Sequence, residues 1–316
     1  MPFTGEILKH RSVSIVGLSK NAGKTECLNY IIQRLPLDYF NVAVTSIGID
    51  GETTDQVTGT AKPEITVREG MFYATSEKHF RQKRPLSELY DVSEEDTALG
   101  RVVTAKALQE GKVLLSGPSS ATALKRWMQS VEGFGIDLIL IDGALSRLST
   151  ASPAVSEAMV LSTGAAYSAN IRELVNKTAF VVELIGLPSY VGPEPRLRVS
   201  SFSALDAGML KGHPVVEVEG ALTDRLLTAA KNALGEDELE LVVGDFTKVF
   251  CSQDLYRAFL RRGGRISVRM KSHLLAVCVN PVAPNGIVLD SDILCRELSA
   301  KIGLPVYDIV KNDYEV

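Results

Sequence analysis

The sequence has few residues of the kinds that build metal centres and disulfide frameworks. It contains four cysteines and four histidines in 316 residues. The cysteines show no Cys-x-x-Cys spacing, and the histidines form no ligand pattern with them, which argues against a zinc site, a disulfide scaffold and thiol redox chemistry. In apolar surroundings a cysteine behaves as a small hydrophobic residue. We therefore expect mainly buried structural thiols at Cys27, Cys251, Cys278 and Cys295.

Charge and hydropathy argue against two further classes of protein. The formal net charge is -4 and the isoelectric point is about 5.7, and no basic stripe is present to neutralise the phosphates of a nucleic acid. No apolar run reaches the length that spans a membrane, and the first ten residues lack the hydrophobic centre of a signal peptide. We therefore expect a cytoplasmic protein that binds neither nucleic acid nor membrane.

The segment from Ser12 to Leu35 has the order that a phosphate-binding loop requires: a β-branched strand, a loop bounded by glycines, Gly-Lys-Thr, and an amphipathic helix. Gly23 allows the backbone to approach a pyrophosphate, Lys24 supplies positive charge to the β- and γ-phosphates, and Thr25 can bind Mg²⁺. The alternative is a chance Gly-Lys-Thr in an ordinary turn. The nucleotide-binding residues that we predict are Gly17, Ser19, Lys20, Asn21, Ala22, Gly23, Lys24 and Thr25.

A second motif places an acid after an apolar strand. Four apolar residues separate Asp137 from Asp142, and Gly143 follows. This is a Walker B arrangement, in which the Asp142 carboxylate holds the Mg²⁺ of a bound nucleotide and Gly143 lets the next loop respond to the γ-phosphate. The alternative is that Asp142 caps the following segment, since aspartate is common at such turns.

The loop from Gly17 to Thr25 is one residue longer than the standard Walker A pattern and resembles that of the dethiobiotin synthetase branch of P-loop proteins, which includes MinD-like enzymes. That branch often carries a second lysine at the position that Ser19 occupies here; Lys20 is one position away, and we assign it no trans-acting role. The resemblance also implies an acid after the second strand that reaches the metal or positions the attacking group. Asp50 is the first candidate and Asp55 the second, with a solvated acidic loop as the equal alternative. The predicted catalytic residues are thus Lys24, Asp50 and Asp142, and the predicted metal ligands are Thr25, Asp50 and Asp142.

Two hydroxyl-rich loops follow further apolar segments, at residues 116–120 and 162–166. In open α/β folds, ligands bind outside the carboxyl ends of the strands, so both loops are expected at the nucleotide edge, where they could bind an acid, a phosphate or the backbone of a partner. Each could equally cap a helix, with Ser119 or Ser120 capping the helix that contains Trp127.

Apolar runs of strand length alternate with helical segments, which predicts an α/β fold with a mostly parallel sheet. Turn residues cluster at 188–200, so we predict a P-loop NTPase-like domain over residues 1–188 and a smaller α/β domain over residues 189–316. The predicted strands are 42–47, 113–116, 138–141, 158–162, 215–218, 239–243, 266–268, 274–279 and 305–309, and the predicted helices after the first are 123–131, 170–187, 223–234, 255–262 and 293–302.

Taken together, Gly17 to Thr25, Ser46 to Glu52, Asp142 to Ser149, Ser152 to Ala154 and Ser162 to Ala165 resemble the reactivase subunit of the adenosylcobalamin-dependent lysine 5,6-aminomutase. The resemblance extends through Asp245 to Lys248 and Val279 to Pro281. It implies a Mg-ATP-dependent ATPase whose partners are the aminomutase and a second reactivase subunit.

Other functions remain open at this stage. One is an ATP-dependent ligase of the dethiobiotin or cobyrinate synthetase type, and another is a nucleotide-gated switch; homodimerisation is compatible with each. The sequence contains no Asn-Lys-x-Asp motif of the kind that reads guanine, and this favours ATP over GTP. Asn280 is a candidate adenine-reading residue by analogy, although the predicted boundary puts it in the second domain.

Overall fold

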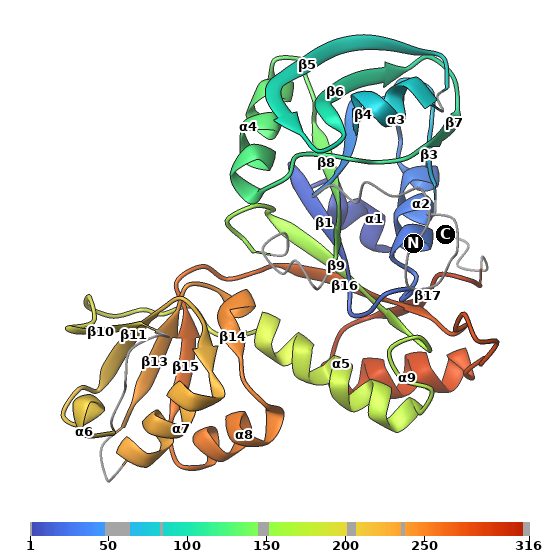
Figure 1. Cartoon of the computed structure of the whole chain (residues 1–316). Helices are drawn as coiled ribbons and strands as arrows, with labels where there is room; N and C mark the ends of the chain where they lie inside the picture. The colour runs from blue at the N-terminus through green and yellow to red at the C-terminus, as the bar shows by residue number, and fades with distance from the viewer. Residues whose placement is uncertain are drawn as a thin grey trace. The chain divides into compact units, whose positions relative to one another are not determined.

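The computed structural model describes residues 2–47, 64–82, 85–144, 152–200, 207–234 and 238–311 (Figure 1). The chain divides into two compact units. The first comprises Met1–Ala151, Val155–Thr178 and Leu274–Val316, and the second comprises Ser152–Ala154 and Ala179–His273. The chain thus leaves the first unit and returns to it.

The first unit is built on a nine-stranded sheet in the order β17-β16-β9-β1-β8-β2-β4-β6-β5 (Figure 1). All neighbouring strands run parallel except β6, which is antiparallel to both β4 and β5. The predicted mostly parallel sheet is confirmed. In chain order the strands are β1 (Ser12–Gly17), β2 (Val42–Ser46), β4 (Phe72–Ser76), β5 (Ser87–Thr97), β6 (Gly100–Ala107), β8 (Leu138–Ala144), β9 (Ala158–Gly164), β16 (Leu274–Asn280) and β17 (Val306–Asp308).

Hydrophobic side chains pack against both faces of this sheet, as burial of a parallel sheet requires. Because side chains alternate along a strand, β8 contributes Leu138 and Leu140 to one core and Ile139 and Ile141 to the other. The first core includes side chains of α1 and α2, and the second includes those of α4. The helices of this unit are α1 (Pro2–Ile7), α2 (Lys24–Arg34), α3 (Glu77–Gln82), α4 (Ala121–Glu132) and α9 (Ser291–Ile302), and the start of α5 (Ile171–Ile185) belongs to it.

The second unit contains a smaller, wholly parallel sheet in the order β10-β11-β13-β15. In β11 the buried Val216 and Val218 alternate with the charged Glu217. In β13 and β15 the last three residues are all buried. The elements are β10 (Leu197–Ser200), α6 (Ala207–Leu210), β11 (Val215–Glu219), α7 (Asp224–Ala233), β13 (Glu240–Val243), α8 (Gln253–Arg261) and β15 (Arg265–Val268), with a small pair formed by β12 (Leu222–Thr223) and β14 (Val249–Phe250).

The structure differs from the sequence-based expectation in two places within the first unit. The strand predicted at 113–116 is wrong as a strand of the main sheet: β7 (Gly111–Val113) pairs antiparallel with β3 (Ile65–Val67) instead. The run that follows is extended without a ladder, and Thr75 Oγ1 donates a hydrogen bond to the carbonyl of Leu114. Three further strands, β4, β5 and β6, lie in a stretch for which the sequence predicted none.

The division into units also differs from a single boundary at 188–200. Residues 274–316 belong to the first unit, where β16 pairs with β9 and β17 pairs with β16. The main part of the second unit, Ala179–His273, is therefore an insertion between β9 and β16. A pattern of local periodicity contains no sign of such a return.

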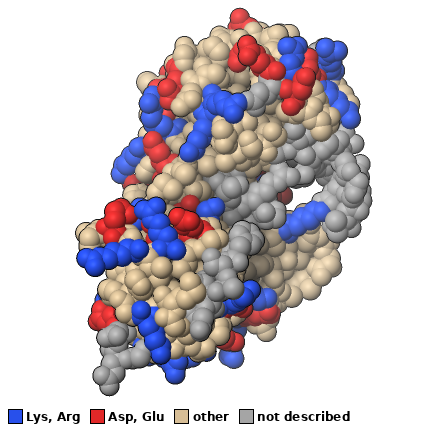
Figure 2. Space-filling view, turned by 60° about the vertical axis from the view of Figure 1, so that its left-hand side comes forward, with Lys and Arg blue, Asp and Glu red and all other residues tan. Residues whose placement is uncertain are grey.

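Charged side chains of both signs are interspersed on the face drawn in Figure 2, which therefore carries no broad field of one sign. Within the described part of the chain, none of the helices combines the length and the apolar character that crossing a membrane requires.

Candidate functional site

The loop between β1 and α2 ends at a glycine whose backbone is left-handed. All six residues of β1 are buried, and α2 begins at Lys24. Gly23 precedes it in the left-handed region, with φ 84°. A Cβ atom at this position would lie 2.6 Å from Cβ of Asn280 and 2.9 Å from Cδ1 of Ile309. The loop therefore needs glycine at position 23 for both its conformation and its space.

The adjacent strand β9 holds this loop in place. The backbone N–H of Leu18 donates to the carbonyl of Ser162 at 2.8 Å. The buried Ser162 hydroxyl donates in turn to the carbonyl of Ala22 at 2.7 Å. The loop predicted at 162–166 was wrong in its start, because β9 continues to Gly164. Ser162 is therefore a strand residue, and it supports the glycine-rich loop directly.

Lys24 and Asp142, predicted from separate motifs, come together. Lys24 Nζ lies 2.7 Å from Asp142 Oδ1. Strand β8 is the neighbour of β1, with Asp142 opposite Ile15 in the register, and this pairing carries the carboxylate to the lysine. Among the described residues, Asp142 Oδ1 has no hydrogen-bond partner apart from this ion pair. Asp142 also lies inside β8, which continues to Ala144, and not at the strand end that we predicted.

The other predicted residues of the loop differ from one another in burial and in hydrogen bonding. The hydroxyl oxygen of Ser19 is buried and lacks a hydrogen-bond partner among the described residues. Lys20 and Asn21 are exposed, and Asn21 adopts a left-handed conformation with φ 61°. Thr25, in the first turn of α2, is 9% exposed. Asp50 and Asp55 lie outside the described residues.

The end of β2 contacts the other predicted loop. The N–H of Gly117 donates to Ser46 Oγ at 3.1 Å, and Ser46 lies opposite Asp142 in the register of β2 and β8. Ser116 Oγ is 2.6 Å from Nδ1 of His79, and both side chains are buried. The sequence analysis had assigned no role to His79. The capping alternative is confirmed for Ser120, whose side chain accepts a hydrogen bond from the N–H of Ala123 at 3.1 Å.

Asn280 also belongs to this edge. It is the last residue of β16, and its Cβ is the nearest atom to the Cβ position of Gly23. Its side-chain oxygen accepts a hydrogen bond from the N–H of Val282 at 2.9 Å. The predicted place of Asn280 in the second domain was wrong, because β16 belongs to the sheet of the first unit.

Two cysteines are buried in α2 and β16, the elements that carry Lys24 and Asn280. Cys27 of α2 is 1% exposed and Cys278 of β16 is fully buried. A hydrogen bond with Cys27, together with burial, raises the pKa of Cys278 well above its ordinary value. A thiol in this state is unreactive, in agreement with the predicted structural role of these two residues.

The donor set at the edge fits a magnesium ion that is bound mainly by phosphate. The described residues contain no group of three or more His, Cys, Asp or Glu side chains able to hold a metal. Mg²⁺ is usually bound by one or two protein oxygens together with substrate phosphates and water. The hydroxyl of Thr25 and the carboxylate of Asp142 are oxygen donors of this kind.

Comparison with known proteins leaves this geometry as the main guide to function. No family model matches the chain, and no curated protein sequence matches it.

Proposed function

We propose that the first unit binds Mg-ATP at the loop from Gly17 to Thr25 and that the protein is an ATPase. The observation that carries this proposal is the 2.7 Å contact between Lys24 Nζ and Asp142 Oδ1. If the Gly-Lys-Thr sequence were a chance match, we would not expect its lysine to contact the acid of a second motif. A P-loop needs both groups within reach of the same phosphates.

Each residue then has a defined task. The backbone N–H groups at the start of α2 face the phosphates, where the positive end of the helix favours anions. Lys24 binds the β- and γ-phosphate oxygens, and Gly23 leaves room for them. A bound Mg²⁺ would neutralise charge on the β- and γ-phosphates; Thr25 and Asp142 are the described residues that would hold it.

The ion pair implies an exchange of partners on binding. Lys24 and Asp142 neutralise one another in the structure. Phosphate oxygens are stronger anionic partners for an ammonium group, so nucleotide binding draws Lys24 away from Asp142. The freed carboxylate then becomes available as an oxygen donor. Breaking the ion pair costs part of the binding energy, and the phosphate contacts offset it.

Asn280 supports the choice of adenine as the base. A side-chain amide offers one donor group and one acceptor, which matches the N6 amino group and ring nitrogen of adenine. The contact of Val282 with Oδ1 leaves the amide donors of Asn280 available in this arrangement. We propose that Asn280 reads the base, with ATP preferred over GTP.

We further propose that the ATPase acts on a partner protein, in the manner of a reactivase for a cobalamin-dependent aminomutase. The motif resemblance supports this partner, and the second unit supplies an additional folded body of a size that commonly binds as a unit. A partner that prefers one nucleotide state would shift the equilibrium between states and alter turnover.

Phosphate release tests this choice. The purified chain is assayed with Mg-ATP alone, then with a cobalamin-dependent aminomutase, and then with small carboxylic acids and amines. The proposal predicts slow basal release that the protein partner accelerates. Turnover that depends strictly on a small carboxylic acid would instead establish a ligase, and nucleotide binding without turnover under every condition would establish a switch.

A further inference from the structure

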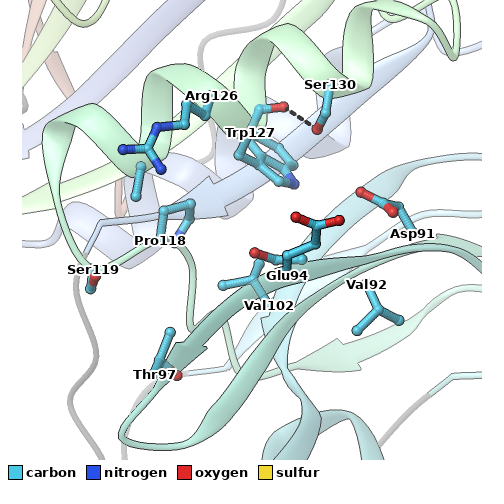
Figure 3. Close-up of a pocket in the computed structure, with 12 residues that line it drawn as sticks. Asp91, Val92, Glu94, Thr97, Val102, Pro118, Ser119, Arg126, Trp127 and Ser130 are labelled. Atoms are coloured by element: carbon cyan, nitrogen blue, oxygen red, sulfur yellow. Dashed lines mark hydrogen bonds between the residues drawn. The ribbon is translucent and has the colours of Figure 1, made fainter.

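The first unit contains a second hollow, away from the glycine-rich loop, between strand β5 and helix α4 (Figure 3). Its volume is about 370 Å³, which lies at the small end of the range for metabolite pockets. Side chains of β5 form one wall, side chains of α4 form the other, and Pro118 and Ser119 close one end. The proposed nucleotide function assigns no role to this pocket.

Two carboxylates from β5 face the pocket. Asp91 and Glu94 both line it, and Figure 3 shows them reaching from β5 toward Trp127. Neither side chain has a hydrogen-bond or ion-pair partner within the described part of the chain. Two unpaired carboxylates in the lining of one pocket favour a cation, because each negative charge raises the energetic cost of the other when they lie within reach of one another.

An irregularity in β5 gives the two acids this common orientation. In a regular strand, residues three apart point to opposite faces. The pairing of β5 with β6 shifts register between Val92 and Asp96, so the alternation is broken between Asp91 and Glu94. Such bulges re-aim side chains and are typical of strands next to functional sites.

The rest of the pocket combines apolar side chains with the hydroxyl groups of Ser93, Thr97, Ser119 and Ser130. Val92 and Val102 lie on the β5–β6 side, and Trp127 lies on the α4 side. The indole Nε1 of Trp127 donates to Thr104 Oγ1 at 2.8 Å, which fixes the orientation of the ring. Figure 3 draws the guanidinium group of Arg126 at the other end, beside Pro118 and Ser119. Apolar side chains together with two carboxylates in one lining suit a short hydrocarbon stem that ends in a positive charge.

We propose that this pocket binds a small aliphatic amine, with its ammonium group between Asp91 and Glu94 and its methylene chain along Trp127. An ammonium group has three N–H donors and can serve two carboxylates together. The competing explanation is that the acids and the bulge of β5 only protect an edge strand from pairing with other chains. That explanation requires no binding in the pocket.

The sequence provides a direct probe, because Trp127 is the single tryptophan of the chain. The full-length protein without nucleotide is titrated with pentylamine, 1,5-diaminopentane and 6-aminohexanoate, and the tryptophan emission is recorded. Pentan-1-ol, which has the same stem without the charge, is the matched control ligand. We expect a saturable change with the amines and none with the alcohol. Comparison of the three amines shows whether a second charged group adds affinity beside Arg126.

Variants locate the effect. Asp91→Asn and Glu94→Gln should each weaken binding by about three- to tenfold, because each removes one partly exposed charge partner, and the double variant should abolish saturation. Glu88→Gln lies on the same strand outside the lining residues and should bind as the parent does. Trp127→Phe serves as the spectroscopic blank. An equal response to pentan-1-ol, or amine binding unchanged in the double variant, would overturn the proposal, and absence of saturable binding would leave edge protection as the role of these acids.

Discussion

Lys24 of helix α2 and Asp142 of strand β8 form an ion pair at 2.7 Å, with both side chains largely buried. Their side chains are 24% and 18% exposed, respectively, so solvent screens the pair less than it screens a surface ion pair. The pairing of β1 with β8 brings them together. This contact joins the two sequence motifs of the proposed nucleotide site.

Replacement of Asp142 by asparagine should separate nucleotide binding from hydrolysis. The amide preserves the shape of the side chain but cannot supply the negative charge for the metal, so Asp142→Asn should keep part of the nucleotide affinity and lose most of its phosphate release. Initial rates of phosphate release at saturating Mg-ATP measure this. Asp137→Asn, just before the same strand, should retain the parental rate. A parental rate in Asp142→Asn would exclude a metal role for this carboxylate.

Alanine at Gly23 should disable the loop. The left-handed conformation alone costs an L-residue about 1–2 kcal/mol, and the added Cβ meets Asn280 and Ile309. We expect loss of nucleotide binding together with a lower melting temperature. Gly5→Ala is the control, since nothing lies within 4 Å of a Cβ there and the site is helical. If Gly23→Ala bound nucleotide normally, the loop geometry described above would not be required for binding.

Ser162 should stabilise the loop from outside it. In Ser162→Ala the buried carbonyl of Ala22 loses its donor, which should reduce stability by about 1–3 kcal/mol and weaken nucleotide binding. Urea unfolding and calorimetry, carried out on the same preparations, measure the two effects. The exposed Ser189, whose hydroxyl makes no hydrogen bond with the described residues, provides the neutral control Ser189→Ala. Unchanged affinity in Ser162→Ala would limit its hydrogen bond to a structural role.

Acid should weaken the second unit through Glu217. Its carboxylate receives two hydrogen bonds of 3.1 Å from Arg269, and this contact lowers the pKa of Glu217 below its usual 4.5. A lowered pKa in the folded state means that the stabilisation is present above pH 4.5 and is lost as the pH falls through the folded-state pKa. The protection of β11 and β15 amides, measured as hydrogen exchange relative to the intrinsic rate at each pH, should therefore fall below pH 4.5 in the parent.

The Glu217→Gln variant tests the cause. Its β11 and β15 amides should be less protected than those of the parent at neutral pH, and their protection should fall less on going to acid. Glu194→Gln is the matched control, since Glu194 also contacts Arg269 but is 71% exposed, where ion pairs contribute little. The same acid response in Glu217→Gln and the parent would assign it to other groups.

The sequence predicted the elements whose residues follow a local pattern. The strand, loop and helix around Lys24 were predictable because β1, which is buried on both faces, carries Val13, Ile15 and Val16, and because α2 buries one apolar stripe. Asp142 was predictable for the same reason, since the apolar residues before it mark a buried strand. Local pattern could not show that β8 is the neighbour of β1, which is the fact that joins the two motifs.

Other features depend on contacts that are distant in sequence. Strand β5 is an edge strand with many polar residues, so its sequence resembles a loop. Strand β16 belongs to the first sheet because it pairs with β9. The same pairing brings Asn280 beside Gly23. The pocket at Asp91 and Glu94 depends on a register shift that no periodicity predicts.

The binding of Mg-ATP to Lys24→Ala tests the central claim most directly. Loss of a charge-assisted phosphate contact should cost about 2–3 kcal/mol, which is more than tenfold in affinity. Titration calorimetry on parent and variant, both shown to be folded by circular dichroism, gives the two dissociation constants. The account predicts measurable binding to the parent and binding at least tenfold weaker, or none, in the folded variant. Equal affinity in the two proteins would contradict a nucleotide site at this loop.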